Sequence, residues 1–143
     1  MRVRSDIWNQ FSGNPTGSGF RLVNTVGANA LRWQSDLQAD TGTSSPVFGP
    51  DGTIYIGTVK GRLVAIEPAH GSIKWTVEIA GRDDLAVQTP AVADDGTIYC
   101  LCTTLAEVRD HRTGPLARGI PSFIIAVGAD GTVRWRMPTP PGG

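Results

Sequence analysis

The sequence lacks a charge imbalance. Its 13 Lys and Arg residues are matched by 13 Asp and Glu residues, so the formal net charge at pH 7 is zero. Proteins that bind nucleic acids or anionic membranes by electrostatic attraction carry an excess of basic side chains. We therefore expect no nucleic acid and no anionic lipid surface among the partners of this chain.

Long hydrophobic runs are also absent. No stretch approaches the roughly 18 to 20 consecutive apolar residues that a membrane-spanning helix requires. The opening residues, MRVRSDIWNQ, contain two arginines but no apolar segment behind them, whereas a secretion signal has one. The sequence as given predicts no membrane insertion and no signal sequence, and by itself it leaves the cellular compartment unknown.

Cysteine and histidine, the usual ligands and nucleophiles, are scarce, with two of each. Cys100 and Cys102 are two residues apart on an expected strand, so their side chains share a face. Core packing is favoured, because free cysteine behaves as a small hydrophobe, and a shared metal is the alternative. His70 precedes a turn glycine and His111 lies in a long loop, where we expect solvated side chains. We predict no catalytic residues and no metal site.

Glycine and proline are abundant, with 18 and 10 copies among 143 residues. They recur at short intervals, which is typical of many short strands joined by tight turns. The phrase DGTIY occurs at residues 51–55 and again 44 residues later at 95–99, and the surrounding residues repeat with it. A period in this range is typical of repeat architectures such as the four-stranded blades of β-propellers.

The first full repeat contains three turn signals, PDG, VKG and AHG, whose glycines supply the positive φ values that tight hairpins require. These turns predict four antiparallel strands, approximately at 45–49, 53–58, 62–67 and 72–79. In the last of them, SIKWTVEI, apolar and polar residues alternate strictly, which indicates a half-buried outer strand. The second, TIYIGT, has no charged face and is predicted to be interior.

Similar outer-strand patterns occur at TVRWRM and, more loosely, at LRWQSDL, each with one tryptophan. Asp51, Asp95 and Asp130 each precede a glycine in a repeated turn. Aspartate is favoured there for local hydrogen bonding, so we interpret the three as turn residues, with calcium coordination as the alternative.

The segment AIEPAHGSIKW resembles the repeat signature of the pyrroloquinoline-quinone-type β-propellers, the quinoprotein dehydrogenase-like family. The signature residues are Ala65, Glu67, Gly71 and Trp75 in the first unit, and Ala126, Gly131 and Trp135 in the second. The second unit, AVGADGTVRW, is one residue shorter and has Gly128 where an acidic residue is usual. The match extends over most of residues 8–137. The resemblance implies that these residues dock one blade against the next.

The expected fold is all-β: an incomplete β-propeller of about two four-stranded antiparallel blades plus an extra N-terminal strand near 31–37. The expected organisation is an extended lead-in at 1–44, blade 1 at 45–88, blade 2 at 89–137 with a loop insertion at 103–122, and a Pro/Gly tail at 138–143. Because propellers use about 4 to 8 blades, we expect either part of a longer propeller or self-association through open blade faces.

The longest departures from minimal turns are residues 81–87 and the insertion 103–122, which antiparallel blade topology places on one rim. Binding residues are often carried by loops on rigid scaffolds. The candidate binding rim consists of Arg82, Asp83, Asp84, Asp110, His111 and Arg112. A solvated loop without a binding role is the alternative.

Three functions follow from the resemblance and from the absence of reacting groups. A non-catalytic scaffold or binding module for protein interaction or cell-envelope assembly, without a cofactor, is favoured. The alternatives are a fragment of a quinone-dependent dehydrogenase and a carbohydrate-binding propeller. For a full-length dehydrogenase relative the resemblance implies pyrroloquinoline quinone with calcium, although such enzymes commonly have adjacent cysteines, which Leu101 separates here. The resemblance also implies a periplasmic, envelope or secreted location.

Overall fold

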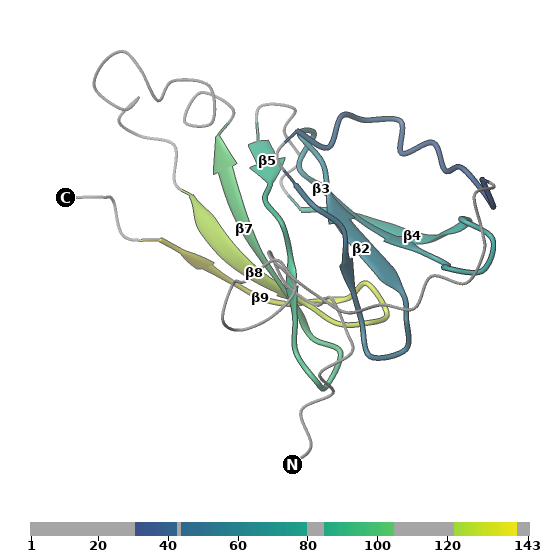
Figure 1. Ribbon diagram of the computed structural model, residues 1–143. Helices are drawn as coiled ribbons and strands as arrows, with labels where there is room; N and C mark the ends of the chain where they lie inside the picture. The colour runs from purple at the N-terminus through teal and green to yellow at the C-terminus, as the bar shows by residue number, and fades with distance from the viewer. Residues whose placement is uncertain (1–30, 43, 80–84, 105–121, 140–143) are drawn as a thin grey trace, which may run out of the picture.

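The computed structural model describes residues 31–42, 44–79, 85–104 and 122–139, and these form two antiparallel β-sheets without a helix (Figure 1). The sheets are open and lie face to face. The prediction of an all-β, incomplete propeller is confirmed. No segment of the described chain has the helical length and hydropathy of a bilayer span.

The first sheet has the order β1-β2-β3-β4. Its strands are β1 (Val47–Phe48), β2 (Ile54–Gly57), β3 (Arg62–Ile66) and β4 (Ile73–Glu78). Gly52, Gly61 and Gly71 lie in the three turns with φ values of 86°, 67° and 71°, a conformation that costs glycine no Cβ clash. The predicted meander, with an interior second strand and an outer fourth strand, is confirmed.

The second sheet contains five strands, one more than predicted. They are β5 (Leu85–Val87), β6 (Ala91–Val92), β7 (Ile98–Thr104), β8 (Phe123–Val127) and β9 (Val133–Pro138). Both β5 and β6 pair with β7, so the innermost strand is broken into two pieces. The break contains Pro90, which has no N–H to donate to a ladder. The sheet is therefore a four-stranded blade whose first strand is interrupted.

The extra strand predicted near 31–37 is not formed. The described residues there pair with no other strand, because Trp33 and Leu37 pack on the face of the first sheet and not beside one of its edge strands. The alternation that prompted the prediction is nevertheless present: Trp33 and Leu37 are half-buried, whereas Gln34 and Asp36 are exposed. The segment 31–42 therefore covers the sheet without joining it.

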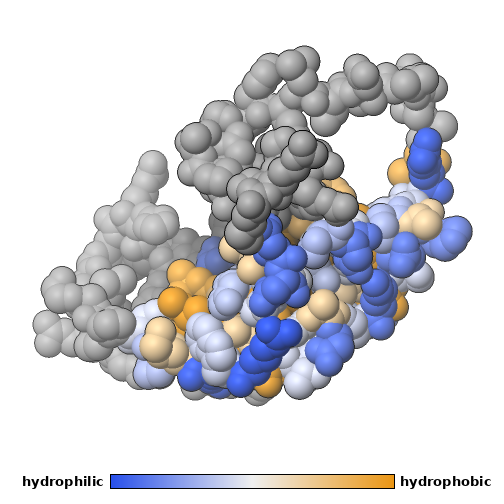
Figure 2. Space-filling view, turned by 90° about the horizontal axis from the view of Figure 1, so that it is seen from below, coloured by the Kyte–Doolittle hydropathy of each residue, from blue (hydrophilic) through white to orange (hydrophobic). Residues whose placement is uncertain are grey.

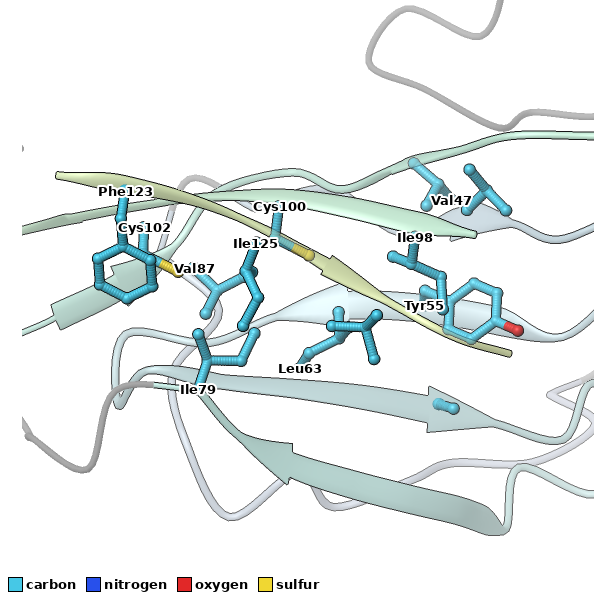
Figure 3. Close-up of a cluster of buried hydrophobic side chains, with 13 residues drawn as sticks. Val47, Tyr55, Leu63, Ile79, Val87, Ile98, Cys100, Cys102, Phe123 and Ile125 are labelled. Carbon is cyan, nitrogen blue, oxygen red and sulfur yellow. The ribbon is translucent and has the colours of Figure 1, made fainter. Parts of the chain in front are cut away.

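The main core lies between the two sheets, as Figure 3 shows. The first sheet contributes Tyr55 and Leu63, and the second contributes Ile98, Cys100 and Ile125, all with 2% exposure or less. A second, smaller cluster on the other face of the first sheet consists of Ile56, Val64 and Ile66, with Trp33, Leu37 and Ile54 packed against it. The first sheet is thus covered on both faces.

The rim that carries the turns between β1 and β2 and between β6 and β7 is largely polar. Figure 2 views the molecule from below Figure 1 and shows hydrophilic residues over much of the described surface, with hydrophobic residues in small groups between them. Tight turns expose backbone and short polar side chains to water, which accounts for this rim.

Candidate functional site

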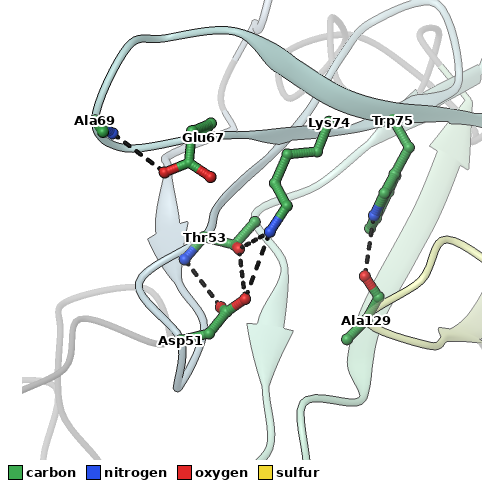
Figure 4. A network of polar contacts seen from close by, with 7 residues as sticks. All are labelled: Asp51, Thr53, Glu67, Ala69, Lys74, Trp75 and Ala129. Atoms are coloured by element: carbon green, nitrogen blue, oxygen red, sulfur yellow. Dashed lines mark hydrogen bonds and ion pairs between the residues drawn. The ribbon is translucent and has the colours of Figure 1, made fainter.

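The repeated phrase DGT builds one compact hydrogen-bonded turn in each blade. In the first blade, Asp51 accepts hydrogen bonds from the backbone N–H of Thr53 at 3.0 Å and from its hydroxyl at 2.8 Å (Figure 4). Lys74 on β4 donates to the Thr53 hydroxyl at 2.8 Å and lies 3.5 Å from the Asp51 carboxylate. The turn is therefore tied to the outer strand of its own sheet.

The second blade repeats this arrangement with arginine in place of lysine. Asp95 accepts from the Thr97 N–H at 2.9 Å, and Arg134 donates to the Thr97 hydroxyl at 2.6 Å. A third turn has the same bond from the Thr132 N–H to Asp130, at 3.0 Å. The three aspartates have the turn role predicted for them.

The hydrogen bonds in these turns also set the pKa values of the carboxyl groups. The backbone N–H groups of Thr97 and Thr132 lower the pKa of Asp95 and Asp130 below the ordinary value. Burial raises the pKa of Asp51, but the bonds from Thr53 and the charge of Lys74 together outweigh it, and the net pKa is lowered. All three carboxylates are thus held in their charged form by groups of the blade itself.

Each blade carries a row of two aromatic rings with an alanine between them. Ala65 lies opposite Tyr55 on β2 and opposite Trp75 on β4, and the two ring centroids are 5.7 Å apart. The small alanine side chain leaves space for the rings to meet over it. In the second blade, Ala126 has the same position between Tyr99 and Trp135, whose centroids are 5.9 Å apart.

Trp75 extends from the first blade onto the second. Its indole Nε1 donates to the backbone carbonyl of Ala129 at 3.0 Å (Figure 4). A Cβ added to Gly131 would lie 3.1 Å from the indole ring. The ring therefore packs directly on the backbone of this residue, which has no side chain in the way. Gly131 also has a φ of 84°. The glycine therefore serves both the turn and the contact with Trp75.

Trp33 makes the equivalent contact one blade earlier. Its Nε1 donates to the Pro68 carbonyl at 2.8 Å, and a Cβ on Gly71 would come within 2.3 Å of its ring. Pro68 and Ala129 occupy the same place in the repeat, as do the two glycines. We call each pair, Pro68 with Gly71 and Ala129 with Gly131, an acceptor turn.

The remaining residues of the repeat signature lie at the same turns and strands. Glu67 begins the first acceptor turn, and its carboxylate accepts from the Ala69 N–H at 3.4 Å. Trp135 is 44% exposed, and no described residue accepts a hydrogen bond from its indole nitrogen. The structure therefore gives an acceptor turn to two of the three tryptophans that lie in the described residues.

The one-residue deletion in the second unit leaves the sheet unchanged. The register shifts between Ala65 and Ile66 in the first blade and between Ala126 and Val127 in the second, which are equivalent positions. The first acceptor turn has Ala69 and His70 between Pro68 and Gly71, where the second has Asp130 alone between Ala129 and Gly131. Since both blades have the same register shift, the difference in length is confined to the turn.

Sequence reasoning missed two contributions to the contact between blades. One is the backbone carbonyl of each acceptor turn, which has no side-chain signature. The other is Gly57, where an added Cβ would lie 2.3 Å from the carbonyl oxygen of Val87 on the second sheet. The glycine at the end of IYIG was the available signal, since a glycine within a strand often marks a close backbone approach.

The cysteines belong to the core between the sheets. Cys100 and Cys102 are unbonded and have 1% and 0% exposure. Burial raises the pKa of the Cys102 thiol to about 12 and raises that of Cys100 further. Since the thiolate is the reactive form, neither side chain is an accessible nucleophile. Core packing, the interpretation favoured from the sequence, describes both.

The described residues do not fit pyrroloquinoline quinone with calcium. The cysteines are separated and buried, the ring of Trp75 lies against Gly131, and the turn aspartates bond to their own backbone. No cluster of three or more His, Cys, Asp or Glu residues able to hold a metal occurs in the part of the chain that is described. We assign no step of chemistry to such a cofactor.

All six residues of the predicted binding rim lie outside the described residues. They are Arg82, Asp83, Asp84, Asp110, His111 and Arg112. The strand ends that flank it are described. Leu85 at the start of β5 pairs with Thr104 at the end of β7. The segments 80–84 and 105–121 therefore connect to neighbouring positions at the same end of the second sheet.

The repeated blades and the tryptophan contacts between them define a β-propeller protein built of pyrroloquinoline-quinone-like repeats. The family model described as outer membrane protein assembly factor BamB matches residues 21–140, and the chain belongs to this family. No curated protein matches the chain.

Two of the solved structures to which the chain is similar share its fold. A quinohemoprotein alcohol dehydrogenase from Comamonas testosteroni is 17% identical, with a TM-score of 0.57 over 99% of this chain and 28% of its own. One from Pseudomonas putida HK5 is 22% identical, with a TM-score of 0.52 over 75% of this chain and 16% of its own. BamB from Moraxella catarrhalis is 23% identical, with a TM-score of 0.33 over 73% and 39%. The chain thus spans less than half the length of each.

Proposed function

We propose that the chain is part of a non-catalytic β-propeller scaffold that binds other proteins in the assembly of the cell envelope. The observation that carries this proposal is the match of residues 21–140 to a family described as an outer membrane protein assembly factor. The envelope location follows from the same description and is part of the proposal.

The use of the repeated residues supports a scaffold. The aspartate, glycine and threonine of DGT form the turn, the tyrosine and tryptophan form the aromatic row, and the acceptor turns receive the tryptophans. Function in such a protein resides in sites added to the fold. The residues that vary between the two units are therefore where we look for partner binding.

We propose that the partner binds the rim formed by residues 81–87 and 103–122. The pairing of Leu85 with Thr104 supports this, because it brings the flanks of both segments to one end of the second sheet. The rim contains charged residues of both signs, among them Arg82, Asp84, Asp110 and Arg112. Charges of both signs favour an electrostatically complementary protein surface over a polyanion.

Alanine substitution of those four residues tests the proposal. The variant should no longer capture the envelope proteins that co-purify with the parent chain. Its free energy of unfolding, measured by thermal unfolding, should change by no more than about 0.5 kcal/mol, as for most surface substitutions. The matched control replaces His70 and Asp94, which are exposed in turns at the other ends of the strands. Undiminished capture by the four-residue variant would refute the rim, and capture of no envelope protein by the parent would refute the function.

A quinone-dependent dehydrogenase is the second candidate, although the described residues offer no site for its cofactor. It is favoured by the fold similarity to two quinohemoprotein alcohol dehydrogenases. The test is to add pyrroloquinoline quinone with calcium to the purified chain and to follow the absorbance of the quinone and the reduction of a dye by added alcohols. A shifted absorbance with alcohol-dependent dye reduction would replace the scaffold proposal.

A further inference from the structure

The outward face of the second sheet is apolar and uncovered by described residues. Two cross-strand rows form it, and we call them the open face: Tyr99, Ala126 and Trp135 in one row, and Leu101, Ile124 and Met137 in the other. The large members are exposed by 39% (Tyr99 and Leu101), 44% (Trp135) and 53% (Met137). A contiguous apolar surface of this kind is typical of an interaction site.

The internal repeat shows what covers such a face. The corresponding rows of the first blade are Tyr55, Ala65 and Trp75, and Gly57, Leu63 and Val77. There Tyr55 and Leu63 have 1% and 0% exposure, because the second sheet packs against them. The covering sheet presents β-branched residues and an acceptor turn. The occupant of the open face should therefore have both features.

The chain itself carries a second surface with both features. The outer face of the first sheet presents Ile56, Val64 and Ile66 beside the acceptor turn of Pro68 and Gly71. Its present cover is the segment 31–42, which pairs with no strand. The segment is held by Trp33, by Leu37 and by one backbone bond from Val59 to Asp40. A cover without a β-ladder can be displaced more readily than a sheet.

We propose that the open face of one copy binds the outer face of the first sheet of a second copy, with Trp135 taking the place of Trp33 on the acceptor turn. The contact would continue the geometry between the two blades, with the Trp135 indole donating to the Pro68 carbonyl over Gly71. The two surfaces differ, so the association is head to tail and produces rings or chains of copies. It goes beyond partner binding at the rim and uses none of its residues.

Sedimentation velocity and light scattering of the 143-residue chain over a range of concentrations test this proposal. The parent should form species that grow with concentration. Trp135→Ala should weaken the contact at least about thirtyfold, as for an aromatic interface hot spot. Leu101→Lys, which places a charge on the open face without touching the tryptophan, should do the same. Leu31→Ala is the control, because Leu31 is 80% exposed and, although it begins the covering segment, is not among the residues packed on the first sheet.

Competition for the acceptor turn gives the sharper readout. Trp33→Ala empties the turn and should tighten association at least about tenfold, because more copies are then competent to bind. Adding Trp135→Ala to this variant should abolish the gain. A monomeric parent, a dimer that ends at two copies, or tightening by Trp33→Ala that persists in the double variant would each overturn the proposal. The last result would indicate nonspecific adhesion of the uncovered first sheet.

Discussion

The two blades have the same residues at the aromatic row but different surroundings. Tyr55 and Tyr99 come from identical phrases, yet Tyr55 is 1% exposed and Tyr99 is 39% exposed. Trp75 donates to a carbonyl of the next blade, whereas Trp135 contacts Tyr99 only within its own blade. The comparison separates what a residue contributes inside a blade from what it contributes between blades.

The turns show the opposite result. Asp51 with Thr53 and Asp95 with Thr97 form the same backbone bond in both blades, although described residues cover both faces of the first blade and one face of the second. The bond between the aspartate and the threonine N–H therefore depends on residues within a few positions in the sequence. The aromatic row depends on whether another sheet is present.

Substitution of Trp75 and of Trp135 should give the largest difference in stability between equivalent positions of the two blades. Trp75→Ala removes a half-buried ring and its bond to Ala129, and should destabilise the chain by about 3 kcal/mol, near the lower limit for buried Trp-to-Ala changes. Trp135→Ala should cost under about 1 kcal/mol in dilute solution, because the ring is already 44% exposed. Urea unfolding of both variants measures the difference. Equal losses would mean that blade docking contributes little to stability.

The two sheets approach each other closely at Gly57, whose equivalent on the open face is Leu101. Gly57→Ala places a Cβ against the Val87 carbonyl and should cost about 2 kcal/mol, since overpacking usually costs 1 to 3 kcal/mol. Leu101 occupies the equivalent place on the open face, and Leu101→Ala should change stability by less than about 0.5 kcal/mol at low concentration. Thermal unfolding checks both. A neutral Gly57→Ala would show that the sheets can separate locally.

The third comparison should show no difference between blades. Thr53→Val and Thr97→Val each remove a buried hydroxyl that accepts from a basic side chain of the outer strand. Each should cost about 1 to 2 kcal/mol, because a hydrogen bond contributes about 1 kcal/mol net and the Thr53 hydroxyl also donates to Asp51. Urea unfolding of the two variants measures both losses of stability. If one loss were several times the other, the turn would not be a local structure that is equivalent in the two blades.

Acid should weaken both blades slightly. Bonds from the Thr97 and Thr132 N–H groups hold the pKa of Asp95 and Asp130 below the unfolded value of about 3.9. The folded chain thus binds fewer protons than the unfolded chain, so this contribution to stability is present above about pH 4 and is lost as the pH falls through the folded pKa. Melting temperatures between pH 7 and pH 3 measure it. Asp95→Asn, which accepts the same bond without titrating, should melt with a smaller pH dependence.

The sequence by itself determined the turns and the four strands of the first sheet. Each positive-φ glycine and each aspartate acts on residues two or three positions away, and the alternation of apolar residues fixes which side chains share a face. These are short-range effects. The amino-acid sequence was therefore enough to predict the meander, its outer and interior strands, and the core position of both cysteines. The repeat signature named Gly71, Trp75 and Gly131 from the resemblance alone.

Tertiary structure decided what lies between the blades. The carbonyls of Pro68 and Ala129 that receive the tryptophans, and the approach of Val87 to Gly57, depend on groups brought together from 30 to 54 positions apart. The same dependence explains why 31–37, with a strand pattern, forms no strand: the pattern sets side-chain directions, but a ladder needs a neighbouring backbone. It also explains why identical tyrosines differ in burial, because exposure is a property of the sheet opposite and not of the residue.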